Sequence, residues 1–284
     1  MKHLFKRTVV LLNRFEGIEP LLQKAKDFAT IHETTLEILY VHEAPLFDVP
    51  DYFLSESKIA NEYLDKGKVR VKIEEQLASV GVSGDHVILI YEDDTVDQVM
   101  HYAKGDKSIL FITEYHPELS HQLIEKTPHT FWIIKNPHLE HYKKVVIPID
   151  FTSEAKRVLE LSKKIFKQSH ISMVHDYRYL LDTVTVPIDY LDINPIVTPE
   201  VLALNEVVKK EREETFESFK KEFGLDGVCI DAEGSLDQDL MAYIAQNRFD
   251  LIVMYHQDSD FFLSPSLIVY LLDDLDLDFF IFNL

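Results

Sequence analysis

The sequence predicts an α/β protein of two tandem, doubly wound domains, each built on a five-stranded parallel sheet. The length of 284 residues exceeds the roughly 100 to 200 residues of one domain. Short and almost wholly apolar strands alternate with amphipathic helices, which is typical of parallel sheets covered on both faces. The same order of elements occurs twice along the chain, and this repeat places the domains at 1–139 and 140–284.

Each half begins with a short buried strand. Arg7–Phe15 (RTVVLLNRF) matches Lys143–Phe151 (KKVVIPIDF), so that Val9 and Val145 correspond at an offset of 145 − 9 = 136. An amphipathic helix follows each strand, with apolar residues at helical spacing over 21–29 and 155–166. A second strand then ends in Val-His-acid in both halves. These second strands are Leu36–Glu43 and His170–Asp176.

The later elements of the two halves follow the same order. A long polar helical segment, 55–80 or 199–223, leads into a third strand, and a short helix carrying Asp-Gln leads into a fourth. Because an exposed aromatic edge would invite aggregation, we expect the two last strands to pair antiparallel, edge to edge, as an intramolecular pseudo-dimer. A further homodimer stays open. The third, fourth and fifth strands are expected at His86–Tyr91, Ser108–Thr113 and Thr130–Lys135, and at Gly227–Asp231, Asp250–Tyr255 and Asp278–Asn283.

Composition excludes several classes of function. Lys and Arg number 29 and Asp and Glu 49, a net charge of −20, which disfavours nucleic-acid binding because that depends on basic side chains. The single cysteine, Cys229, cannot form an internal disulfide, which favours a cytoplasmic protein. The apolar runs fall far below the ~20 residues that span a bilayer, so we expect no membrane insertion.

Several segments of the second half, in their order, resemble the universal stress protein family. They are a strand ending in Asp150, the following Phe-Thr-Ser-Glu-Ala and helix, Ser-Met-Val-His, a Gly-Ser-Leu-Asp helix start and Phe-Asp-Leu-Ile-Val-Met. The whole chain resembles a tandem pair of such domains. The resemblance implies a stress-response protein, with the family's carboxylate near adenine present as Asp150 in the second half and replaced by Asn13 in the first.

The glycine-rich motif of the family's nucleotide-binding members is missing. They carry G-x-x-G, nine residues and G-[ST] directly after the fourth strand, where glycine lets the backbone approach phosphates. No glycine stands at these positions, and Asp258 and Asp260 would repel a triphosphate. We therefore expect that neither half binds ATP in the family's manner and that no cofactor is needed. The four signature positions of the motif are occupied by Tyr255, Asp258, Ile268 and Val269 in the second half. In the first half they are occupied by Thr113, His116, Lys126 and Thr127.

Four residues form a candidate ligand site in the second half. Asp150 stands where the carboxyl ends of parallel strands open into a crevice, with Thr152 beside it. His175 closes the second strand and can act there as a ligand or proton relay, and Tyr255 follows the fourth strand. An alternative interpretation is purely structural. Asp150 is then an acid at the beginning of a helix, and His175, like His42 in the first half, is a hydrogen-bonded histidine at a strand end.

Two acidic clusters resemble metal sites only in composition. Neither has the glycine and terminal glutamate of an EF-hand loop, and we expect solvated acidic rims without a metal. The histidine pairs are too loosely spaced for zinc. The clusters are Glu92, Asp93, Asp94 and Asp97, and Asp273, Asp274, Asp276 and Asp278.

A proline-containing segment at 177–202 is unusually apolar for a connection. It predicts a docking surface for a protein partner or an apolar small molecule, or else a lid over its own domain. The leading hypothesis is a non-catalytic regulatory binding module. The alternative is a nucleotide-binding or nucleotide-hydrolysing switch with a modified site near Asp150. The surface residues are Tyr179, Leu180, Ile188, Tyr190, Ile193 and Ile196.

Overall fold

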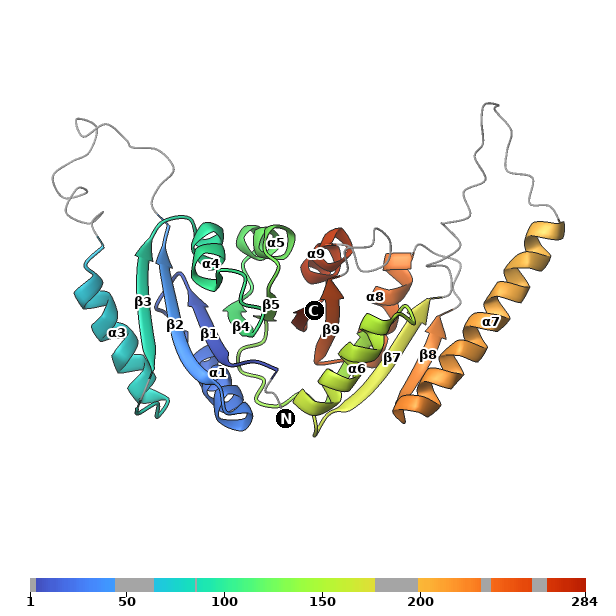
Figure 1. Ribbon diagram of the computed structural model, residues 1–284, viewed down its shortest axis with the longest axis horizontal. Helices are drawn as coiled ribbons and strands as arrows, with labels where there is room; N and C mark the ends of the chain where they lie inside the picture. Colours follow the sequence, from blue (N-terminus) through green and yellow to red (C-terminus); the bar gives the residue numbers. More distant parts are fainter. Residues whose placement is uncertain (1–3, 44–63, 85, 177–198, 231–235, 257–264) are drawn as a thin grey trace, which may run out of the picture. The chain divides into compact units, whose positions relative to one another are not determined.

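The computed structural model describes residues 4–43, 64–84, 86–176, 199–230, 236–256 and 265–284. Contacts divide the chain into two compact units, unit 1 with Met1–Glu140 and Asp278–Leu284, and unit 2 with His141–Leu277. Each unit is an α/β layer structure in which helices cover a sheet (Figure 1). The predicted fold class is confirmed in both units.

Unit 1 has the strand order β3-β2-β1-β4-β5-β10. The neighbours from β3 to β5 are parallel, whereas β10 pairs antiparallel with β5 and places Phe280 opposite Trp132. This pairing confirms the expected edge-to-edge contact of the two last strands. The strands are β1 (Arg7–Leu12), β2 (Thr35–His42), β3 (Val87–Glu92), β4 (Ile109–Glu114), β5 (Thr130–Ile134) and β10 (Asp278–Asn283).

The helices of unit 1 pack in pairs, α1 against α3 and α4 against α5. The chain runs outward from β1 to β3 and then back to β4 and β5. Because crossovers between parallel strands are right-handed as a rule, this order places the two helix pairs on opposite faces of the sheet. The apolar stripe predicted on the first helix is buried, from Leu21 to Ala29. The helices are α1 (Glu19–His32), α3 (Lys66–Ser79), α4 (Thr95–Ala103) and α5 (Pro117–Lys126).

Unit 2 repeats the inner part of this topology. Its parallel strands follow the order β9-β6-β7-β8, which matches β4-β1-β2-β3 of unit 1. The strands are β6 (Lys144–Pro148), β7 (His170–Asp176), β8 (Asp226–Ile230) and β9 (Leu251–His256). The helices are α6 (Ser153–Ile165), α7 (Pro199–Phe223), α8 (Leu236–Asn247) and α9 (Pro265–Asp274).

The last strand departs from two expectations. The expected second domain, 140–284, includes Asp278–Leu284, but the contacts of this segment assign it to unit 1 because β10 pairs with β5. The prediction of a solvated rim is wrong for Asp278, which is fully buried. Its Oδ1 accepts hydrogen bonds from the amides of Lys135 and Asn136, each at 2.8 Å, so the carboxylate replaces lost water with backbone donors.

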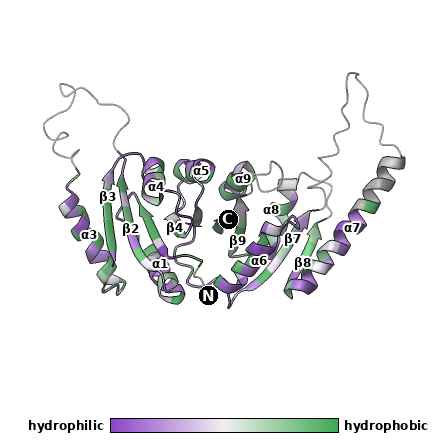
Figure 2. Ribbon diagram, viewed as in Figure 1, coloured by the Kyte–Doolittle hydropathy of each residue, from purple (hydrophilic) through white to green (hydrophobic). Residues whose placement is uncertain are grey.

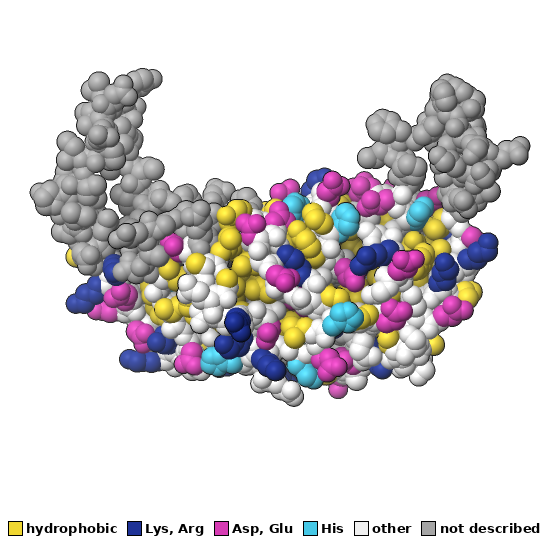
Figure 3. All heavy atoms as spheres, turned by 180° about the vertical axis from the view of Figure 1, so that it is seen from behind, with side chains coloured by type: hydrophobic (Ala, Val, Ile, Leu, Met, Phe, Trp, Pro, Cys, Tyr) yellow, Lys and Arg dark blue, Asp and Glu magenta, His cyan; other side chains and the backbone are white. Residues whose placement is uncertain are grey.

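Polarity follows the layers. The strands are mostly hydrophobic and the helices carry hydrophilic residues among apolar ones (Figure 2). On the face drawn in Figure 3, acidic and basic side chains are interspersed among apolar ones. Within the described ranges, none of the helices has the length and apolar character needed to cross a membrane.

Candidate functional site

The candidate site of unit 2 is built around Asp150, just beyond the carboxyl end of β6. Asp150 Oδ1 accepts hydrogen bonds from the amide of Thr152 at 3.2 Å and from its hydroxyl at 2.6 Å. Thr152 in turn is the N-cap of α6, because its Oγ1 accepts from the amide of Ala155 at 3.2 Å. The carboxylate is therefore tied to the beginning of α6.

Tyr255 approaches the same carboxylate from β9. Its hydroxyl donates to Asp150 Oδ1 at 2.5 Å, and its side chain is fully buried. Burial, reinforced by the nearby charge of Asp150, raises the pKa of Tyr255 above its ordinary value. The phenol of Tyr255 therefore stays protonated and acts as a hydrogen-bond donor. The structure thus brings together three of the four residues predicted for this site, namely Asp150, Thr152 and Tyr255.

His175, the fourth, lies in an aromatic cluster. It is fully buried on β7, its Nδ1 is 2.7 Å from the carbonyl oxygen of Ile149, and the centroid of its ring is 4.1 Å from that of Phe151. Phe151 has φ of 65°, a left-handed conformation that costs about 1–2 kcal/mol for a residue with a side chain. The ring of Phe151 packs against that of Phe219, at 5.2 Å between centroids.

In unit 1 the residue corresponding to Asp150 is Arg14, which corrects the expectation of Asn13. The difference 150 − 14 = 136 equals the offset of Val9 and Val145, and the ends of β1 and β6, Leu12 and Pro148, differ by the same amount. Arg14 Nε donates to Glu114 Oε2 at 2.9 Å, and Nη2 donates to the same oxygen. Sequence reasoning missed this pair, although the repeat offset identifies Arg14.

A small cavity of about 90 Å³ lies beside this ion pair, at the carboxyl ends of β1 and β4. Ligand pockets for drug-sized molecules measure about 300–1,000 Å³, so this space is too small for a nucleoside triphosphate. Its lining combines apolar and polar side chains, and two of them stand at positions of the missing glycine motif. The lining residues are Leu11, Leu12, Asn13, Arg14, Ile18, Leu21, Thr113, Glu114, Tyr115, His116 and Leu119.

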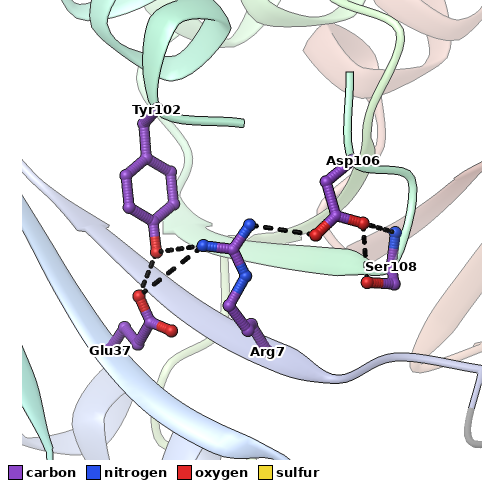
Figure 4. A network of polar contacts seen from close by, with 5 residues as sticks. All are labelled: Arg7, Glu37, Tyr102, Asp106 and Ser108. Carbon is purple, nitrogen blue, oxygen red and sulfur yellow. Dashed lines mark hydrogen bonds and ion pairs between the residues drawn. The ribbon is translucent and has the colours of Figure 1, made fainter. Parts of the chain in front are cut away.

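A second polar network lies at the opposite, amino end of the sheet in unit 1 (Figure 4). Arg7 Nη1 donates to the Tyr102 hydroxyl at 3.1 Å, and that hydroxyl donates to Glu37. Arg7 Nη2 donates to Asp106 at 3.1 Å, and Asp106 also accepts from the amide of Ser108 at 2.9 Å. The groups bind one another across β1, β2, α4 and the start of β4, so this network stabilises the fold.

The remaining predictions concern the acidic clusters and the docking surface. In the first acidic cluster, Asp94 is the N-cap of α4, where it accepts from the amide of Asp97 at 2.9 Å. The structure shows no group of three or more His, Cys, Asp or Glu arranged to hold a metal ion in the parts that it describes. The docking residues predicted at 179–196, together with Asp258 and Asp260, lie outside the described residues.

Comparison with solved structures gives full-length matches. A universal stress protein from Archaeoglobus fulgidus DSM 4304 is 12% identical, with a TM-score of 0.61 and 99% of both chains covered. A functionally unknown protein from Pseudomonas aeruginosa PAO1 is 13% identical, with a TM-score of 0.63 and coverage of 98% of this chain and 92% of that one. The chain has the universal stress protein fold. A protein assigned to that family from Pseudomonas aeruginosa UCBPP-PA14 agrees, at 14% identity, a TM-score of 0.60 and coverage of 98% and 93%.

By sequence, the chain matches no protein-family profile and no curated protein. The universal stress protein fold nevertheless fixes which positions correspond in the two units. In each, a side chain just beyond the first strand contacts one on the fourth strand, Arg14 with Glu114 in unit 1 and Asp150 with Tyr255 in unit 2. Ligands of open α/β sheets bind at this switch in strand order. Both units of this universal stress protein fold therefore carry a side-chain bridge across the switch point.

Proposed function

We propose that the chain is a non-catalytic, cytoplasmic binding module of tandem universal stress protein type, acting in a stress response or in regulation. It does not bind ATP in the family's manner. Its ligand is a protein partner or an apolar small molecule. The fold supplies the family context, and the two side-chain bridges support the loss of the nucleotide site.

The Asp150–Tyr255 bridge is the observation that carries the proposal. A ligand that binds Asp150 Oδ1 competes with the Tyr255 hydroxyl, which is fully buried and donates to the same oxygen. Losing a hydrogen bond from a buried hydroxyl costs about 1–3 kcal/mol. Without the glycines, the backbone N–H groups cannot approach the phosphates of ATP. The hydrogen bonds that would offset the cost of displacing Tyr255 are therefore missing.

Unit 1 supports the same proposal by different chemistry. Glu114 places a carboxylate at the switch point, where a phosphate would be repelled, and Arg14 is already engaged with it. The adjacent cavity is lined by Leu11, Leu21 and Leu119 among others, which suits a small apolar group better than a polyphosphate. The larger docking surface expected at 177–202 remains part of the proposal.

ATP titration of the full chain tests the central negative claim. We expect no calorimetric heat and no thermal shift with ATP and Mg²⁺, either for the parent or for Asp150→Ala. Glu114→Gln is a matched variant that removes the charge in unit 1 and keeps the side-chain shape. A thermal shift with ATP that disappears in Asp150→Ala would overturn the proposal and favour the nucleotide switch.

Native mass spectrometry of the purified protein tests the positive claim. An apolar adduct of small mass, or a bound protein chain released only on denaturation, supports a binding module. A copurifying nucleotide contradicts it. To place an apolar adduct, Leu119→Phe adds bulk at the cavity of unit 1, and it should remove the adduct if the cavity is the binding site.

A further inference from the structure

His129 is a buried histidine whose ring has no hydrogen bond. It immediately precedes β5 and is 3% exposed. Neither Nδ1 nor Nε2 has a hydrogen-bond partner in the part of the chain that the structure describes. The ring packs against Phe111 of β4, at 5.6 Å between centroids. A protonated imidazole would therefore be a buried cation without an acceptor.

The charged groups around His129 offset only part of this penalty. Asp106 and Lys107 face it from the connection before β4, while β4 contributes the uncharged Phe111. Asp106 is already bound to Arg7 and Ser108, and these contacts, Ser108 first, keep the pKa of its carboxyl below the ordinary value. Burial lowers the pKa of His129; Lys107 lowers it further and Asp106 opposes the shift.

His129 also lies where the last strand ends. Phe280 is opposite Trp132 and Ile281 opposite Phe131. If this antiparallel register is extended by two residues, Asn283 comes level with His129. The Asn283 amide donates to Thr130 Oγ1 at 3.1 Å, and Lys107 Nζ donates to the carbonyl oxygen of Leu284 at 3.2 Å in an exposed contact.

The opposite end of β10 is held more strongly. There Asp278 is fully buried and accepts two amide hydrogen bonds while pairing with Lys24. Hydrogen bonds to a charged group are worth about 1.5–3 kcal/mol, against about 0.5–1.5 kcal/mol for neutral ones. We therefore expect an opening of β10 to begin at its carboxyl end, which is the end nearer to His129 in the sheet.

We infer that His129 is an acid-operated latch for β10: while neutral it lets the carboxyl end of β10 dock against β5, and its protonation releases that end. This device goes beyond the proposed function and does not depend on any ligand. The folded pKa is lower than the unfolded value of about 6.5, so the stability from His129 is complete above about pH 6.5 and is lost as the pH falls toward the folded pKa.

The single tryptophan provides a direct readout. Trp132 lies on β5, and its ring centroid is 6.0 Å from that of Phe280 on β10. We expect urea unfolding followed by Trp132 fluorescence to show an unfolding constant about tenfold larger at about pH 5.5 than at about pH 8 owing to His129. His129→Phe should remove this part of the pH dependence, whereas His101→Gln, at an exposed position on α4, should keep it.

Amide exchange corrected for the intrinsic effect of pH locates the opening. On acidification, protection should fall in the last residues of β10 before it falls in β2. Equal loss in both strands, or an unchanged pH dependence in His129→Phe, would overturn the latch. If that variant does not fold, an NMR titration of His129 in the parent protein decides: a pKa at or above about 6.5 contradicts the proposal.

Discussion

Lys24 of α1 and Asp278 of β10 form an ion pair, with 3.7 Å between Nζ and Oδ2, although their side chains are only 7% and 0% exposed. Burial lowers the pKa of Lys24, and the charge of Asp278 opposes that shift. Lys24 Nζ also donates to the carbonyl oxygen of Leu139, which follows β5. The pair therefore links the last strand of the chain to the first helix.

Removing one member of this pair should be costly. Lys24→Met leaves the carboxylate of Asp278 buried without its cation, and we expect a loss of about 3–5 kcal/mol in the free energy of unfolding. Urea unfolding followed by circular dichroism measures it. Lys24→Met combined with Asp278→Asn removes both charges and should regain much of the loss. Equal stability of Lys24→Met and the parent protein would contradict the structural role of the pair.

Tyr255→Phe tests the bridge in unit 2. The substitution removes one hydrogen bond to Asp150 from a fully buried side chain, and we expect a loss of about 1–2 kcal/mol in the free energy of unfolding. Tyr91→Phe is the matched control, because Tyr91 is half-buried on β3 and its hydroxyl makes no hydrogen bond within the described residues. A loss no larger than that of the control would show that the bridge contributes nothing to stability.

Alkaline pH should destabilise the fold through two tyrosines. Burial first, and then the carboxylates of Glu37 and Asp150, raise the pKa values of Tyr102 and Tyr255 above the ordinary value. A raised folded pKa means that the stability from each group is complete below about pH 10 and is lost as the pH rises further. Tyr102 and Tyr255 should therefore be among the tyrosines whose absorbance shows ionisation only on unfolding. The double variant Tyr102→Phe/Tyr255→Phe should lose the contribution of these two groups, and normal titration of all tyrosines in the folded parent would refute it.

Gly227 on β8 should not tolerate a side chain. A Cβ there would lie 2.5 Å from the carbonyl oxygen of Met173 and 2.8 Å from Cζ of Phe216. Because a backbone atom is involved, we expect Gly227→Ala to cost about 1–3 kcal/mol, measured as a lower thermal midpoint. Gly17→Ala is a useful contrast: no atom lies within 4 Å of its Cβ, so its cost comes from its φ of +71° alone. An unchanged midpoint for Gly227→Ala would contradict the close approach of Met173 on β7 and Phe216 on α7 to this glycine.

The order of elements was predictable because hydrophobic periodicity is local. The offset of 136 residues located β1 and β6, and the apolar stripe on α1 followed from helical spacing. The pairing of β5 with β10 was also predictable, since two aromatic edge strands need cover. Of the candidate site, Asp150, Thr152 and Tyr255 contact one another, because parallel strands bring their carboxyl ends to one edge, and their role in ligand binding stays a prediction.

The sequence by itself determined the α/β class, the repeat and the absence of the glycine motif, all of which depend on residue type and spacing along the chain. Only the tertiary structure decided which side chains meet: Arg14 and Glu114 are 100 residues apart, and Asp150 and Tyr255 are 105 apart. These contacts form because strand order makes the first and fourth strands neighbours. The burial of Asp278 was likewise decided by the tertiary structure, because its carboxylate accepts the amides of Lys135 and Asn136, which lie far from it along the chain.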